Sequence, residues 1–394
     1  MRSQIEGSRA VGDTVARCRP EVVCAYPITP QTHIVEHVGR LVKAGELAPC
    51  EFINAESEFG ALSVAIGASA AGARTYTATA SQGLLFMAEA LYNASGLGLP
   101  IVMTVANRAI GAPINIWNDH SDAMSQRDAG WIQLYAETNQ EAADLHIQAF
   151  HIAETLSLPV MVCMDGFVLT HAFEQVDVPT QEQVDAFLPP HTHQAVLDPD
   201  DPASTGALVG PEAFTEVRYL ADRRHRLARS VIPAVAASFE DAFGRRSGGL
   251  VRPYAHEDAE VVVVALGSVL GTLEEVVDDL RSDGVPVGLL SVRTYRPFPY
   301  DAVRDALENA ARVVVLERSV APGAGGAVTA DVRTALAGLT TPVHTVVAGL
   351  GGRPITKTSL RGMLTDAAAG RLEPSTFLDL HRELIEKELI GSPR

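Results

Sequence analysis

The stretch VVCAYPITPQT, residues 22–32, joins an apolar run typical of a β-strand to two prolines that flank a single threonine, Thr29. A helical pattern follows at once, with apolar residues at the spacing of one helical face: Ile34, Val35, Val38, Leu41 and Val42. A buried strand that ends in a stiff turn and leads directly into a helix is the beginning of an α/β unit.

The same alternation continues to about residue 165. Strands are expected at 22–26, 52–55, 74–79, 101–107 and 159–165. Helices are expected at 32–42, 56–71, 81–95 and 139–156, and the segment 108–131 shows no clear periodicity. Continuous apolar strands separated by helices predict a parallel sheet that is covered on both faces.

A second α/β pattern occupies the C-terminal part of the chain. Residues 170–210 are rich in Pro, Asp and Thr and predict a surface connector, which a helical stretch at 212–244 follows. Further strands are expected at 260–268, 287–299, 311–319 and 342–352. We therefore predict two α/β domains, residues 1–250 and 251–394.

Composition excludes several classes of protein. The sequence contains no run of 18 uncharged apolar residues, so we predict no membrane span. The N-terminus lacks the apolar core of a secretory signal, so we predict none. The net charge of −17 argues against binding to nucleic acid. The four cysteines (Cys18, Cys24, Cys50 and Cys163) form no C-x-x-C pair, so we expect isolated thiols in a cytoplasmic protein.

Three loops follow predicted strands and are candidate ligand-binding segments, because ligands of open α/β sheets bind beyond the carboxyl ends of the strands. They are YPITPQT (26–32), SQGL (81–84) and NRAIGAP (107–113). Thr29 suits a helix N-cap with Pro30 at the first helical position. That role is compatible with a ligand contact, since a helix N-terminus also favours anions.

Three charged residues near these loops, Arg108, Glu56 and Glu58, require a choice between a structural and a functional interpretation. Arg108 is either a surface ion-pair partner or a planar fork that binds a carboxylate. Glu56 and Glu58 fall in the first turn of a predicted helix, where the helix dipole favours acids. Glu58 precedes a long run of small and apolar residues, so burial and a raised pKa are expected for it.

The segment 114–131 is unusually rich in polar and aromatic groups for a long irregular loop, which favours a functional role. His120 beside Asp119 and Asp122 suggests a metal ligand set, but no second cluster accompanies it, and we expect no metal ion on this chain. The sequence also lacks a G-x-G-x-x-G fingerprint, a P-loop and the GDG…NN stretch that binds a diphosphate in thiamine diphosphate enzymes.

Seven stretches in chain order resemble those of a known family: AYPITPQT (25–32), ESEFGALSVAIGASAAGART (56–75), TATASQGLLFMAEALYNASG (77–96), the block from NRAIGAP to EAADL (107–145), MDGFVLTH (164–171), YRPFP (295–299) and GLGGRPIT (349–356). The chain resembles the α subunits of pyruvate:ferredoxin oxidoreductases (pyruvate synthases), within the 2-oxoacid:ferredoxin oxidoreductases. The block NIWNDHSD (115–122) is similar to the pyruvate branch of that family.

The resemblance implies a pyrimidine-type thiamine-diphosphate-binding domain followed by a domain like the C-terminal domain of transketolases. It implies a β subunit that carries the GDG…NN motif with Mg2+, and γ and ferredoxin-like δ subunits that carry [4Fe–4S] clusters. The reaction implied is the reversible oxidative decarboxylation of pyruvate to acetyl-CoA and CO2, with coenzyme A as co-substrate and ferredoxin as electron acceptor.

The resemblance also assigns roles to residues. Thr29 would hydrogen-bond pyruvate, Arg108 would bind its carboxylate, and Glu58 would share a proton with the aminopyrimidine ring of the cofactor. Further cofactor contacts are implied for Pro27, Ile28, Ser81 and Gln82. Two alternatives stay open: a related enzyme of another 2-oxoacid (2-oxoisovalerate, 2-oxoglutarate or oxalate), and a non-catalytic assembly subunit.

Overall fold

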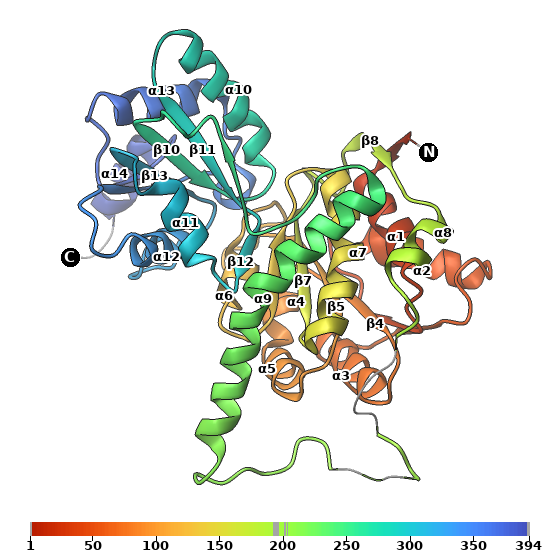
Figure 1. Cartoon of the computed structure of the whole chain (residues 1–394). Coiled ribbons are helices and arrows are strands. Elements are labelled where there is room, and N and C mark those ends of the chain that lie inside the picture. The colour runs from red at the N-terminus through yellow and green to blue at the C-terminus, as the bar shows by residue number, and fades with distance from the viewer. Residues whose placement is uncertain (1, 192–196, 201, 203, 392–394) are drawn as a thin grey trace.

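The computed structural model describes residues 2–191, 197–200, 202 and 204–391, and it contains two α/β units side by side (Figure 1). The first sheet has seven strands in the order β12-β6-β7-β5-β4-β2-β3. Its members are β2 (Val22–Ala25), β3 (Glu51–Asn54), β4 (Thr75–Thr79), β5 (Val102–Asn107), β6 (Ile132–Tyr135), β7 (Val160–Asp165) and β12 (Thr294–Arg296). All neighbours are parallel except β12, which runs antiparallel to β6, so the expected parallel sheet is confirmed.

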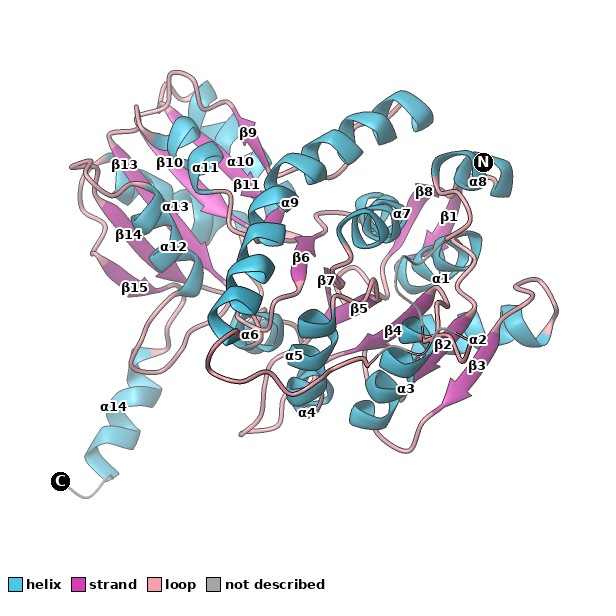
Figure 2. Cartoon of the chain, turned by 60° about the horizontal axis from the view of Figure 1, so that its bottom comes forward, coloured by secondary structure: helices cyan, strands magenta, loops and turns pink. Residues whose placement is uncertain are grey.

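Helices cover both faces of this sheet (Figure 2). Several helices share one apolar core on the first face, among them α1 (Gly7–Arg17), α2 (Thr32–Lys43), α7 (Asn139–Leu156) and the C-terminal half of α9 (Phe214–Phe243). Four others pack on the second face: α3 (Glu58–Ala70), α4 (Ser81–Phe86), α5 (Ala88–Leu97) and α6 (Ser121–Ser125). The N-terminal half of α9 extends beyond the domain (Figure 1).

The second sheet has the order β15-β14-β13-β10-β11-β9, with β9 alone antiparallel to its neighbour. Its strands are β9 (Val251–Tyr254), β10 (Val261–Ala265), β11 (Val287–Val292), β13 (Arg312–Glu317), β14 (Val343–Val347) and β15 (Ser375–Phe377). Its helices are α10 (Val269–Ser282), α11 (Tyr300–Leu307), α12 (Ala327–Ala335) and α13 (Lys357–Ala368). A short 3-10 turn, η1 (Leu350–Gly352), precedes α13, and α14 (Arg382–Gly391) ends the described chain.

The two units are less separate than the sequence predicts. Strand β12 follows β11 in the chain but leaves the second sheet and pairs with β6 of the first. A single apolar core also runs from Trp131 and Tyr135 of the first unit to Leu290 and Val315 of the second. The domain boundary near residue 250 stays a prediction. The assignment of the whole stretch 287–299 to the second unit is wrong, because β12 lies in the first sheet.

The expected connector at 170–210 is wrong in its first part. Residues Phe173–Asp177 form β8, which pairs antiparallel with β1 (Arg2–Glu6), a strand that the sequence analysis did not identify. Residues Gln181–Phe187 form α8, which begins with a capping box between Thr180 and Gln183. The polar composition of this stretch gave no signal for either element. Strand β8, moreover, is stabilised by β1, a partner far away in the sequence. Part of the rest of the connector, 192–196, 201 and 203, lies outside the described residues.

No described helix is both long and apolar enough to cross a membrane.

Candidate active site

The candidate residues gather at one edge of the first sheet, where its parallel strands end. Thr29 follows β2, Glu58 follows β3, Ser81 follows β4 and Arg108 follows β5. Because β3, β2, β4 and β5 are successive neighbours in the sheet, their C-terminal loops lie next to one another. Pro27 and Ile28 lie on the same loop as Thr29, with Pro27 exposed and Ile28 half-buried.

Thr29 lies in a turn that precedes α2, and its expected role as helix N-cap is wrong. Helix α2 begins at Thr32, and the N-cap position is Gln31, whose side chain makes no capping hydrogen bond. Gln31 instead stabilises the turn: its Nε2 donates to the carbonyl oxygen of Ala78 in β4 at 2.6 Å, and its Oε1 accepts from the backbone N–H of Ile28 at 3.2 Å. Thr29 is exposed, so its hydroxyl is accessible to a ligand.

Glu58 is a buried acid without a partner. Ser57 caps α3 by accepting from the backbone N–H of Gly60 at 3.1 Å, which places Glu58 in the first helical turn. The residue is 9% exposed, and no described residue donates a hydrogen bond to its carboxylate. A β-carbon at Gly83 would lie 2.7 Å from Glu58 Oε1, so the carboxylate packs against the start of α4.

The carboxylate oxygens of Glu58 are not fully enclosed, so solvent still reaches them and a ligand can do so as well. Glu58 therefore has the geometry of a group that awaits a hydrogen-bond donor. The neighbouring Glu56 is exposed, and its Oε1 accepts from the Ser57 hydroxyl at 3.0 Å. The expected burial of an acid is thus found at Glu58 and not at Glu56.

The turn at Ser81 and Gln82 joins β4 to α4. Ser81 has a φ of +49°, its hydroxyl donates to the carbonyl oxygen of Ala109 at 2.5 Å, and it also contacts Gln82 Oε1. A β-carbon at Gly111 would lie 2.6 Å from Gln82 Nε2. The turn after β4 is therefore held against the loop after β5.

Arg108 joins two loops through its guanidinium group. Nη1 donates to the carbonyl oxygen of Thr29 at 3.0 Å, and Nε donates to the carbonyl oxygen of Asn115 at 2.9 Å. Nη2 makes no hydrogen bond within the described part of the chain. Burial lowers the pKa of Arg108, against the charge of Asp122. The residue is 9% exposed, and Nε is already engaged by Asn115. A substrate carboxylate would therefore have to bind the Nη1–Nη2 end of the guanidinium group.

Asp122 organises the site, whereas its sequence context suggested only a metal ligand. Its carboxylate accepts from the backbone N–H groups of Ser81 and Arg108, both at 2.9 Å, and from Asn107 Nδ2 and the N–H of Ala123, both at 2.8 Å. Burial raises its pKa, while these hydrogen bonds lower it. One fully buried carboxylate thus fixes the ends of β4 and β5 relative to α6.

Asp119 and His120 are likewise engaged elsewhere and do not form a metal site with Asp122. Asp119 accepts from the backbone N–H groups of Ser121 at 2.9 Å and Gly351 at 3.0 Å. His120 Nε2 lies 2.7 Å from Asp165 Oδ1. The polar loop therefore serves to join the two α/β units beside the site.

Asp165, at the end of β7, is the centre of that junction. It pairs with Arg318 Nη1 at 2.5 Å and accepts from the backbone N–H of Ser268 at 2.9 Å, and it also contacts the Ser268 hydroxyl. Burial alone would raise the pKa of Asp165, but the charges of Arg318 and His120 hold it well below its usual range. The sequence did not reveal this group, because two of its partners, Ser268 and Arg318, lie more than 100 residues away.

The arrangement fits thiamine diphosphate on its pyrimidine side. The aminopyrimidine ring has a nitrogen that can share a proton with a carboxyl group, and Glu58 offers a carboxyl group that no described residue already binds. Nothing in the neighbouring loops supplies a diphosphate-binding motif, in agreement with its absence from the sequence.

Comparison with known families agrees with this geometry. Residues 13–237 match the family model described as pyruvate flavodoxin/ferredoxin oxidoreductase, thiamine diphosphate-binding. Residues 259–360 match pyruvate:ferredoxin oxidoreductase core domain II. The chain belongs to the pyruvate flavodoxin/ferredoxin oxidoreductase family. Both the resemblance and the fold expected from the sequence are thereby confirmed.

Curated relatives in this oxidoreductase family match over most of their length. The chain is 48% identical to pyruvate synthase subunit PorA of Methanosarcina barkeri, over 97% of each chain. It is 39% identical to ketoisovalerate oxidoreductase subunit VorA of Pyrococcus horikoshii, over 93% of each chain.

A solved structure shares the fold. It is a 2-oxoglutarate:ferredoxin oxidoreductase from Magnetococcus marinus with 2-oxoglutarate, coenzyme A and succinyl-CoA bound. The TM-score is 0.71 at 20% identity, with 93% of this chain covered. The chain spans 65% of the length of that solved chain.

Proposed function

We propose that the chain is the α subunit of a pyruvate synthase, which converts pyruvate and coenzyme A reversibly to acetyl-CoA and CO2 with transfer of electrons to ferredoxin. The identity of 48% to a pyruvate synthase subunit over nearly the whole length supports this activity. The observation that carries the residue roles is Glu58: a buried carboxylate without a partner lies at the sheet edge where Arg108 meets Thr29.

In the proposed site, Arg108 binds and orients the substrate carboxylate with the outer end of its guanidinium group. The two carbonyl oxygens that it already contacts fix the plane of this group before the substrate arrives, which limits the entropy lost on binding. Thr29 donates its hydroxyl to the substrate from a turn that Pro27 and Pro30 stiffen. Ile28, Ser81 and Gln82 line the cofactor side of the same site.

Glu58 holds a proton against the ring nitrogen of the cofactor in this proposal. Thiamine diphosphate, when bound, supplies the electron sink that the decarboxylation of a 2-oxoacid requires. The low exposure of Glu58 limits the access of water to the shared proton, and a lower local dielectric strengthens the hydrogen bond. The packing of its carboxylate against Gly83 orients the acid toward the site.

The proposal requires partner subunits. A β subunit would bind the diphosphate with Mg2+ through its GDG…NN motif, and γ and δ subunits would carry [4Fe–4S] clusters to ferredoxin. The absence of the diphosphate motif and of cysteine clusters from this chain supports that division. The four cysteines are free thiols, which suits the cytoplasm as the proposed location.

The experiment that tests the proposal measures ferredoxin reduction by the purified complex with four substrates: pyruvate, 2-oxoisovalerate, 2-oxoglutarate and oxalate. We expect the highest kcat/KM with pyruvate and no activity from this chain alone. The similarity to a ketoisovalerate oxidoreductase subunit makes 2-oxoisovalerate the second candidate substrate. A higher kcat/KM with any other acid would reassign the substrate. Unchanged activity of a complex with Thr29, Glu58 and Arg108 all replaced by alanine would indicate a non-catalytic assembly subunit.

A further inference from the structure

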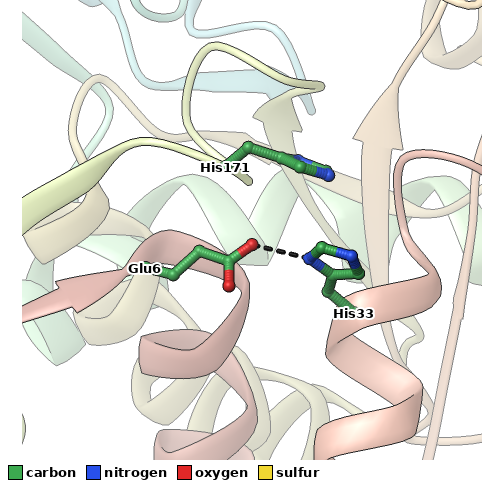
Figure 3. A group of neighbouring side chains, drawn as sticks. All are labelled: Glu6, His33 and His171. Atoms are coloured by element: carbon green, nitrogen blue, oxygen red, sulfur yellow. Dashed lines mark hydrogen bonds and ion pairs between the residues drawn. The ribbon is translucent and has the colours of Figure 1, made fainter.

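A separate cluster of three side chains lies outside the candidate site: Glu6, His33 and His171 (Figure 3). Glu6 ends β1, His33 is in the first turn of α2, and His171 lies on the segment between β7 and β8. Nδ1 of His33 is 2.7 Å from Glu6 Oε1, and the two imidazole rings are 4.6 Å apart between centroids. One nitrogen or oxygen atom from each residue lies within 4.8 Å of the other two.

The backbone fixes two of these residues side by side. Glu6 is paired in register with Phe173 in the β1–β8 ladder, and the N–H of Gly7 donates to the carbonyl oxygen of Ala172 at 3.0 Å. His171 immediately precedes this ladder. The proximity of Glu6 and His171 therefore follows from strand pairing and not from the chance orientation of long side chains.

His171 is oriented by a neighbouring hydroxyl. Its Nδ1 lies 2.7 Å from Thr170 Oγ1, which also accepts from the backbone N–H of Phe167 at 2.8 Å. A hydrogen bond at Nδ1 leaves Nε2 available to a ligand, and histidines that bind metals usually make such a second bond. The ring also packs against Phe167, with the ring centroids 4.8 Å apart and the planes tilted by 39°, which further restricts its rotation.

We propose that Glu6, His33 and His171 bind one divalent transition-metal ion, of which Zn2+ is the representative. Two imidazoles and one carboxylate are donors that zinc, cobalt and nickel share, whereas Mg2+ and Ca2+ prefer oxygen alone. Ligands about 2.0–2.1 Å from a tetrahedral ion are about 3.3–3.5 Å apart, so modest rotation of the side chains completes the site. His33 is 50% exposed, which permits that rotation and leaves a coordination position for water.

The ion would connect the first turn of α2 to β1 and to the segment before β8, two elements that the strand ladder already joins. Bound to β1, to the segment before β8 and to the first turn of α2, it would hold α2 immediately after the turn of Gln31. Pro27 and His33 both line a groove of about 1120 Å³ on this side of the molecule, so the site lies behind the loop of Thr29. The proposed role is structural, and it does not depend on the proposed function.

Zn2+ titration of the full-length, metal-free chain against a chromophoric chelator tests this proposal. We expect one equivalent bound by the unchanged chain. His33→Ala and His171→Ala should each weaken binding by more than about 100-fold, since loss of even an outer hydrogen-bond partner of a ligand weakens metal binding about 10–100-fold. His256→Ala is the matched control, because this imidazole makes no hydrogen bond among the described residues and lies in the second unit. The affinity of the His256→Ala variant for Zn2+ should equal that of the unchanged chain.

Co2+ in place of Zn2+ gives a second readout, because its visible absorption reports the ligand set. We expect a visible band with one equivalent of Co2+ and its loss in Glu6→Gln, a change that preserves the shape of the side chain. Far-UV circular dichroism of the metal-free variants checks that they are folded. Binding of Zn2+ to His33→Ala and His171→Ala with the affinity of the unchanged chain, or no stoichiometric binding to the unchanged chain, would overturn the proposal.

Discussion

Arg108 Nη1 donates a hydrogen bond to the carbonyl oxygen of Thr29 at 3.0 Å, and this bond joins the loops that follow β5 and β2. The two residues that we propose as substrate ligands are thus in direct contact before any substrate binds. A change at Arg108 should consequently affect both the charge and the shape of the substrate pocket.

Replacement of Arg108 by alanine should raise the KM for pyruvate far more than the KM for coenzyme A. A hydrogen bond to a charged group is worth about 1.5–3 kcal/mol, or roughly 10- to 150-fold in binding. Arg108→Lys keeps the charge but loses the planar fork, so it should not restore affinity. Steady-state kinetics of the assembled complex measure both constants, and equal increases in the two KM values would show a structural role instead.

Gly83→Ala should reduce turnover without unfolding the chain. The new β-carbon would lie 2.7 Å from Glu58 Oε1 and 2.6 Å from Thr79 Oγ1, so the flexible carboxylate must move. Displacement of a catalytic group by about 1 Å can lower a rate roughly 100-fold. Gly96→Ala in α5 is the control, because nothing lies within 4 Å of its β-carbon position. Equal kcat values for the two variants would contradict the placement of Glu58.

Asp165→Asn should destabilise the junction between the two α/β units. The change leaves Arg318, which is 6% exposed, without its counter-charge, and loss of one partner of a buried pair costs about 3–5 kcal/mol. Differential scanning calorimetry should show a lower Tm. Asp258→Asn removes an exposed partner of Arg281 and should leave the Tm nearly unchanged. A Tm for Asp165→Asn that equals that of the control would contradict this account of the junction.

Glu317 should make the protein less stable as the pH rises toward neutrality. Burial raises its pKa from 4.5 to about 7, so the folded chain keeps a proton that the unfolded chain has already released. Stability therefore falls between pH 4.5 and 7, by about 3 kcal/mol, and stays constant above. Glu317→Gln should remove this dependence and unfold at a higher temperature at pH 7.5. A variant with the pH profile of the unchanged chain would refute the assignment.

Local sequence patterns predicted the strands and helices whose signal is local. Helix α7 coincides with the predicted range 139–156, because its apolar residues recur with the helical period over 18 residues. Strands β1 and β8 escaped prediction, since each is a strand only through the other. Strand β12 was assigned to the wrong sheet for the same reason: its partner β6 lies in the other unit.

The candidate site shows the same limit. Glu58, Thr29 and Arg108 are recognisable because they follow strands of one parallel sheet, whose loops must meet. The role of Asp122 was not predictable, because its hydrogen-bond donors come from three separate segments of the chain. The role of Gln31 depends likewise on Ala78, 47 residues away. Sequence patterns locate the groups at the sheet edge but not the buried side chains that hold them in place.

The central claim is that Glu58 of this chain activates thiamine diphosphate held by the assembled complex. Its most direct test is the rate of hydrogen–deuterium exchange at the thiazolium carbon of the bound cofactor in Glu58→Gln and Glu56→Gln complexes with normal cofactor content. We predict that Glu58→Gln lowers the exchange rate roughly 10²- to 10⁴-fold, as expected for loss of a general acid–base group, while Glu56→Gln exchanges normally. Exchange at the unchanged rate in Glu58→Gln would contradict the claim.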